Sequence, residues 1–183
     1  ELYQRLLAWK FSDGRTFVLD RERDTWSLWM GWNAETNNFT AWAGTATCIR
    51  DDSGVSVVGT NDGKILKLER RSVSDNGTDI VMDLRTGFVT RGSALRKWCK
   101  HVRLMFHGGD DADGHALVSW RDGFSAWEPD RAISLSRGAL GGTLGVDLYG
   151  LGVYKARQWR LRYSGSEDIV FAGAFEEFEV AED

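Results

Sequence analysis

The chain has 183 residues, of which 42% are hydrophobic and 27% are charged, and its formal net charge is -4. The hydrophobic share excludes a disordered chain, and the acidic balance argues against a dedicated nucleic-acid binder, which normally carries a basic excess. No apolar run approaches the roughly 20 residues that a membrane-spanning helix needs, so we expect no membrane contact.

Glycine and tryptophan are both abundant. The 21 glycines against a single proline predict many tight turns rather than proline-rich linkers. The nine tryptophans indicate either aromatic packing between sheets or a surface that binds a partner. The two cysteines, Cys48 and Cys99, have no metal-binding spacing, and we expect free thiols in a reducing compartment.

Residues 1–70 are predicted to form antiparallel hairpins. Asp13-Gly14 and Asp62-Gly63 each separate two runs of alternating apolar residues, and Asp-Gly suits the positive φ of a tight hairpin turn. The opening residues fit a short helix or a strand. Residues 30–50 fit a strand or a long loop, because their apolar positions follow no clear period.

The polar segment 71–79 is predicted to be a linker, and residues 80–183 are predicted to form an antiparallel β-sandwich. The glycine-dense stretch 136–152 suits a long connection across the end of this sandwich. In the last strand, a bulge near Glu176-Glu177 would keep four apolar residues on the inner face. These residues are Phe171, Phe175, Phe178 and Val180.

Two segments led by a tryptophan, Leu95–Gly108 and Ala156–Gly165, predict matching strands of the sandwich. Alternation places an apolar row on one face of each strand and a polar row on the other. The expected apolar rows are Trp98, Val102, Leu104 and Phe106 in the first segment and Trp159, Leu161 and Tyr163 in the second.

The basic residues of these two segments form a predicted basic stripe. If the two strands were neighbours in one sheet, their side chains would form ladders able to contact DNA or an acidic face of another subunit. An ordinary solvated face, balanced by acids on adjacent strands, is the alternative reading. The residues of the basic stripe are Lys97, Lys100, His101, Arg103, Arg157, Arg160 and Arg162.

No motif indicates an enzyme. Asp110, Asp111 and Asp113 lie in a glycine-flanked loop, but no glutamate follows at the spacing of a calcium loop, so a solvated turn is expected. His101 and His107 fall on opposite faces of their strand, which argues against a shared metal site. The sequence contains no nucleophile elbow, P-loop or dinucleotide fingerprint. We therefore predict no catalytic residue, no cofactor and no metal.

Several motifs occur in a particular order along the chain. They are Val18–Asp20 with Trp26-Ser27, then Gly59–Leu68, then Leu84–Phe88, and then Lys97–Leu104. In this order they resemble the C-terminal part of the tail hub or nozzle proteins of short-tailed bacteriophages, a group that includes packaged-DNA stabilisation proteins. The resemblance implies propeller-like hairpins over residues 1–70, followed by the sandwich.

The same resemblance implies a structural function, with no catalysed reaction. The chain would be a virion protein of the phage tail, made in the host cytoplasm, that forms a homo-oligomeric ring and contacts other tail or portal proteins. It would help retain packaged DNA, and its acidic charge suits a channel past which DNA slides without sticking.

A carbohydrate-binding β-sandwich module of a phage or bacterial adhesin or depolymerase is the alternative hypothesis. Sugar faces stack on indole rings, and the surplus of tryptophans motivates this reading. Trp29, Trp32 and Trp42 would form the binding platform.

Overall fold

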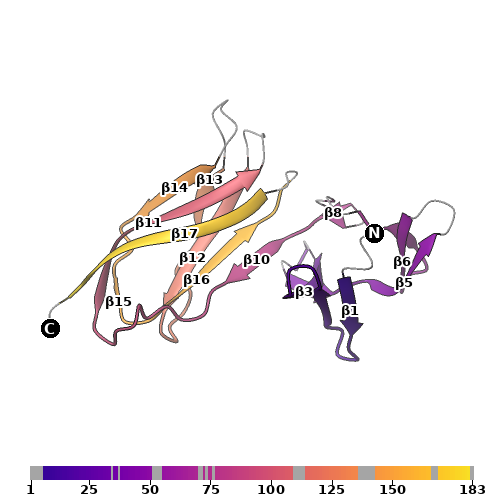
Figure 1. Cartoon of the computed structure of the whole chain (residues 1–183), viewed down its shortest axis with the longest axis horizontal. Coiled ribbons are helices and arrows are strands. Elements are labelled where there is room, and N and C mark those ends of the chain that lie inside the picture. The colour runs from indigo at the N-terminus through magenta and orange to yellow at the C-terminus, as the bar shows by residue number, and fades with distance from the viewer. Residues whose placement is uncertain are drawn as a thin grey trace. The chain divides into compact units, whose positions relative to one another are not determined.

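A computed structural model gives the fold of this chain. It describes residues 6–33, 35–36, 38–50, 55–69, 72, 74–75, 77–108, 114–135, 143–165 and 169–181, with the backbone alone at 48–50 and 108. Strands make up 65% of these residues, they contain no helix, and every strand pairing is antiparallel (Figure 1). The predicted all-β class is confirmed.

The chain divides into two compact units, which are described separately. Unit 1 comprises residues 1–80 and unit 2 comprises residues 81–183. The division falls just after the segment predicted as a linker. Within that segment a short antiparallel pair forms between β8 (Ser74–Asp75) and β9 (Thr78–Asp79).

Unit 1 contains two sheets in which strands adjacent in sequence pair with each other. The four-stranded sheet runs in the order β1 (Leu6–Lys10), β2 (Thr16–Asp20), β3 (Thr25–Asn33) and β4 (Asn38–Ala41). The three-stranded sheet runs in the order β5 (Gly44–Arg50), β6 (Val55–Thr60) and β7 (Ile65–Lys67).

Both Asp-Gly hairpin predictions are confirmed. Gly14 has a φ of 88° between β1 and β2, and Gly63 has a φ of 78° between β6 and β7. Glycine adopts this left-handed backbone without the steric cost that a Cβ atom adds. The ambiguous stretch 30–50 consists largely of strand, since it holds the end of β3 together with β4 and β5.

Unit 2 contains two further sheets. One has the order β10 (Met82–Arg85), β16 (Arg157–Tyr163), β12 (His115–Asp122) and β13 (Arg131–Ser134). The other has the order β14 (Leu144–Tyr149), β11 (Lys97–Gly108) and β15 (Val153–Tyr154), with β17 (Ile169–Val180) paired along β11. In Figure 1, β17 runs beside β11 along nearly its whole length.

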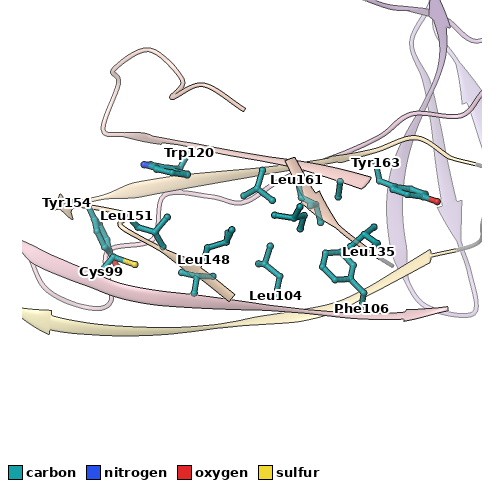
Figure 2. Close-up of a cluster of buried hydrophobic side chains, with 14 residues drawn as sticks. Cys99, Leu104, Phe106, Trp120, Leu135, Leu148, Leu151, Tyr154, Leu161 and Tyr163 are labelled. Atoms are coloured by element: carbon teal, nitrogen blue, oxygen red, sulfur yellow. The ribbon is translucent and has the colours of Figure 1, made fainter. Parts of the chain in front are cut away.

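The two sheets of unit 2 share one hydrophobic core. Figure 2 shows side chains of β12 and β16 pointing toward side chains of β11 and β14. Buried members of the core include Leu104, Phe106, Trp120, Leu161 and Tyr163. The predicted inward row of the second tryptophan-led segment is therefore confirmed for Leu161 and Tyr163, while Trp159 is half-buried against the core.

A bulge in β11 makes one part of the predicted inward row wrong. The pairing of β11 with β17 shifts register between Cys99 and His101, so Lys100 is the extra residue. Because one extra residue reverses the alternation, Lys97 and Cys99 share the inner face with Val102, Leu104 and Phe106. Trp98, predicted to point inward, is instead 54% exposed.

The bulge predicted in the last strand lies elsewhere. Met105 pairs with Gly173 and Phe106 with Phe171, so Ala172 is the extra residue rather than Glu176 or Glu177. As a result, Phe171 and Phe178 are half-buried and Phe175 is exposed, while Val180, which shares the alternation of Phe178, is exposed at the end of the strand.

The prediction of a long connection over residues 136–152 is wrong for part of that range. Leu144–Tyr149 forms the strand β14, and its Leu148 is buried in the core. The high glycine content concealed this strand, because glycine has a low strand propensity. Residues 136–142 lie outside the described part of the chain, as do Asp110, Asp111 and Asp113 of the loop considered for calcium.

Candidate functional site

The predicted basic stripe does not form. Its residues lie on β11 and β16, which belong to different sheets of unit 2 and are not neighbours. Ladders between their side chains would need two adjacent strands in one sheet. The seven residues instead divide among three environments: the interior of the unit and the outer face of each sheet.

Lys97 and Arg157 lie in the interior, where the prediction had placed solvated side chains. Lys97 is 0% exposed, and its Nζ donates hydrogen bonds to the carbonyl oxygens of Ser93 (2.7 Å), Leu95 (2.7 Å) and Lys155 (3.0 Å). These three acceptors compensate for the loss of water around the ammonium group. The Lys97 ammonium group therefore bridges three loop carbonyl oxygens and is not accessible to an external ligand.

Arg157 is 1% exposed and forms a two-pronged ion pair with Asp122, with distances of 2.7 Å from Nε and 2.9 Å from Nη2. Its guanidinium also lies over the ring of Tyr154, with Cζ 4.5 Å from the centroid. This double engagement fixes the start of β16 to the end of β12, and it removes Arg157 from any external contact.

A second buried polar group lies beside Tyr154. The Glu176 side chain is 2% exposed and accepts hydrogen bonds from the Tyr154 hydroxyl (2.8 Å) and from Arg91 (2.8 and 3.0 Å). Burial, and then the nearby Glu176 carboxylate, raise the pKa of the Cys99 thiol to about 12. A thiol with such a pKa stays protonated at neutral pH and is a poor nucleophile.

Lys100, His101 and Arg103 lie on the outer face of the β14–β11–β17 sheet, where acids surround them. Arg103 pairs with Asp147 at 2.7 Å, and this hydrogen bond lowers the pKa of the aspartate. Lys100 pairs with Glu179 at 2.5 Å, and His101 lies 3.3 Å from Glu177. These contacts match the solvated, charge-balanced alternative better than an anion-binding stripe.

Arg160 and Arg162 lie on the outer face of the other sheet. Arg160 contacts Asp83 at 2.6 Å, and Arg162 pairs with Asp130. Burial raises the pKa of Asp83, but hydrogen bonds from Arg160 and Arg85 outweigh that effect and hold the pKa below its usual value. The two arginines are thus engaged within the unit.

The predicted tryptophan platform does not present a flat surface. Trp29 and Trp42 pack edge to face, with ring centroids 5.2 Å apart and planes at 78°. Trp32 packs in the same way on Phe39, at 4.9 Å and 72°. All three indoles are half-buried, whereas stacking on a sugar needs an open ring face.

An apolar surface that sequence reasoning missed lies on the sheet of β1, β2 and β3. The register places Leu7, Leu19 and Trp26 in one cross-strand row, and Trp9, Phe17 and Leu28 in the next. We call these six residues the apolar face. Alternation along one strand cannot tell which side of a sheet is covered, and the register between the strands is needed to bring the six residues together.

On the opposite, more polar side of this sheet, the central strand β2 is covered, whereas Ala8 and Lys10 of β1 and Ser27 of β3 are exposed. Thr16 and Val18, which point away from the apolar face, are each 1% exposed. Residues 41–44 lie against that covered side: Lys10 Nζ donates to the carbonyl oxygens of Trp42 (2.9 Å) and Gly44 (2.8 Å). Antiparallel sheets normally cover their apolar side, so the exposure of the apolar face is unusual.

Four members of the apolar face are substantially exposed. The exposed fractions are 41% for Leu7, 43% for Trp9, 61% for Trp26 and 44% for Leu28. Trp9 and Trp26 touch across β2, with ring centroids 5.2 Å apart and planes at 32°. A contiguous exposed apolar patch of this kind is a candidate interaction surface.

Within the described residues, no group of three or more His, Cys, Asp or Glu side chains could hold a metal ion. Over the same part of the chain, no helix has the length and hydrophobicity that crossing a membrane requires. Comparison with known protein families finds no family that matches this chain, and a search of curated proteins finds no match either.

Proposed function

We propose that this chain is a structural protein of a larger assembly, and specifically a ring-forming tail hub or nozzle component of a short-tailed bacteriophage. The observation that carries the assembly part of the proposal is the apolar face, which is open on a sheet whose central strand is covered from the other side. Such a face has a poor free energy in water, so a partner surface is its natural environment. In this role the protein acts through contacts between folded surfaces.

The hairpins of unit 1 support the more specific part of the proposal. The motif Val18–Asp20 with Trp26-Ser27 forms the β2–β3 hairpin, and Gly59–Leu68 includes the β6–β7 hairpin. Each belongs to a small sheet of sequentially paired strands, which is the way the blades of a β-propeller are built. We therefore propose that unit 1 is propeller-like.

Unit 2 supports a structural role in a different way. We propose that its two sheets form a β-sandwich, because they enclose one core from opposite sides. The buried ion pair of Arg157 with Asp122, and the Arg91, Tyr154 and Glu176 cluster, add directional bonds to that core. Networks of this kind favour one rigid arrangement, as a subunit of an assembly requires.

Electron microscopy of the purified full chain tests the proposal. We expect ring-shaped particles in negative stain and a matching homo-oligomer mass in native mass spectrometry. A matched sample of the Trp26→Glu variant checks whether the apolar face contributes to assembly. A chain that stays monomeric at high concentration and also fails to bind phage tail or portal proteins would contradict the proposal.

A glycan array separates this proposal from the carbohydrate-binding alternative. We expect no glycan signal from the purified chain, because Trp29 and Trp42 occupy each other's ring surfaces. Submillimolar binding that is lost on Trp42→Ala would favour the sugar-binding module instead.

A further inference from the structure

The apolar face has the size of an interface between two protein chains. From the exposed fractions of its side chains, it leaves on the order of 500 Å² of apolar surface open, close to the upper end for any patch on a monomer. A typical specific interface covers about 800 Å² on each partner. The exposed area of the apolar face is thus more than half of the area that one partner buries in a stable interface.

The chemistry of the apolar face selects the kind of partner. All six of its side chains are aliphatic or aromatic, and the Arg15 guanidinium lies over the ring of Phe17, with Cζ 5.8 Å from the centroid. A sugar needs hydrogen-bonding groups next to the indoles to bind its hydroxyls, and the apolar face offers none. Its complement is another apolar protein surface.

The rim of the apolar face carries balanced charge. The two turns at its ends contain three arginines and three acids, and the charges alternate in sign along Arg21–Asp24. Arg15 pairs with Asp13 at 2.6 Å, so part of this charge is neutralised locally. A membrane-binding face would have a strongly basic rim, whereas a balanced rim lets the surface meet a copy of itself without net repulsion.

We infer that the apolar face is a homodimer interface, in which the β1–β3 sheets of two copies pack face to face. Two sheets packed in this way lie about 10 Å apart and interdigitate their side chains. Trp26 and Trp9 are the anchors, because exposed indoles contribute most to such contacts.

The inferred dimer has two-fold symmetry. It is a contact in addition to those of the proposed ring. A surface that meets its own copy closes as a pair, whereas a ring requires two different surfaces that meet head to tail. The dimer would therefore add to the ring contacts. Its test needs no phage component, so the dimer inference and the phage proposal can fail separately.

Sedimentation equilibrium of the full chain, over a range of concentrations, tests the inference. We expect the wild type to form a dimer. In Trp26→Glu the dimer dissociation constant should rise roughly 30-fold or more, because burying the new carboxylate at the interface removes it from water without giving it a partner. Trp98→Glu is the matched control, because Trp98 is also an exposed tryptophan on a strand, in unit 2. The control should dimerise like the wild type.

Three results would overturn the inference. The first is a wild type that stays monomeric at 100 µM, roughly the upper limit for a specific weak contact. The others are a dimer dissociation constant that is unchanged in Trp26→Glu, or one that rises equally in Trp98→Glu. Circular dichroism establishes that each variant is folded. If Trp26→Glu does not fold, Trp26→Ser removes the indole without adding charge and is expected to weaken the dimer in the same direction.

Discussion

At the scale of single residues, the least expected feature is the burial of charge. Lys97 alternates with apolar residues as a solvated side chain does, whereas Arg157 shares the alternation of Trp159 and Leu161, and both charged side chains are enclosed in unit 2. Burial of Lys97 is tolerable because three carbonyl oxygens replace water, and Arg157 keeps the Asp122 carboxylate as a partner at Nε and Nη2. These residues are therefore structural, and their removal should lower stability without affecting any external contact.

Lys97→Met is expected to lower the free energy of unfolding by about 2–4 kcal/mol, because three loop carbonyls lose a charged donor. Urea unfolding followed by circular dichroism measures the change. Lys100→Met is the control, since the Lys100 ion pair with Glu179 lies at the surface and contributes little. Equal stability of the two variants would contradict the role given to Lys97.

The Cys99 thiol is expected to resist alkylation by iodoacetamide at pH 8 in the native protein. With its pKa raised to about 12 by burial, almost no thiolate exists at that pH. Rates measured in a Cys48→Ser background, with and without urea, isolate this thiol. Native and unfolded protein reacting at the same rate would contradict its burial.

The same thiol predicts a pH dependence of stability. Its folded-state pKa lies above the ordinary value of 9.0, so the folded state holds the proton more tightly than the unfolded state. The stabilisation is complete below pH 9.0 and is lost progressively as the pH rises toward about 12. Urea unfolding of wild type and Cys99→Ala over this range should show a steeper decline in the wild type.

At the scale of elements, the close approach between Trp42 and Gly44 fixes the link from β4 to β5. A Cβ atom added at Gly44 would lie 2.3 Å from the Trp42 ring, which itself packs on Trp29. The absence of a side chain at Gly44 therefore lets the indole cover the sheet.

Gly44→Ala is expected to destabilise unit 1 by about 1–3 kcal/mol, because the ring must leave its place on Trp29. Hydrogen exchange of the amides in β2 and β3 measures the loss. Gly59→Ala is the control, since the nearest atom to its added Cβ is a carbonyl oxygen at 3.9 Å. Equal protection in the two variants would show that the approach of Trp42 to Gly44 has no structural role.

Sequence alone predicted the hairpins and the all-β class well, because local turn chemistry decides them. Asp13-Gly14 and Asp62-Gly63 need no knowledge of distant residues. The inward row of β11 was partly wrong, because a bulge at Lys100 is set by the partner strand β17. The covered side of the β1–β3 sheet was not predictable, since alternation identifies two sides without showing which one is packed.

The adjacency assumed for the basic stripe was wrong for the same reason. Whether β11 and β16 are neighbours depends on sheet topology, which the two sequences do not encode locally. The tryptophan platform also required a spatial arrangement, and Trp29 and Trp42 formed a ring pair instead. The useful signal was the surplus of tryptophans, which pointed to a binding surface but not to its location.

At the scale of the whole molecule, the two units differ in how much apolar surface they bury. In the described part of unit 1 the buried hydrophobic residues are Val18 and Val58, whereas unit 2 has a continuous core across two sheets. Since apolar burial is the main source of stability, unit 2 should be the more stable unit.

Hydrogen exchange of the full chain at low concentration, where unit 1 has no partner, checks this difference. The amides of β11, β12 and β16 should exchange more slowly than those of β2, β3 and β6. Uniform protection in both units would contradict it and indicate a single cooperative unit.

The central claim is that another protein surface covers the apolar face in the assembled state. Hydroxyl-radical footprinting with mass spectrometry measures this directly, residue by residue, in separated monomer and oligomer fractions. We predict that oxidation of Trp9 and Trp26 falls several-fold in the oligomer, as expected when exposed anchors become buried at an interface. Equal oxidation of these two tryptophans in both fractions would contradict the claim.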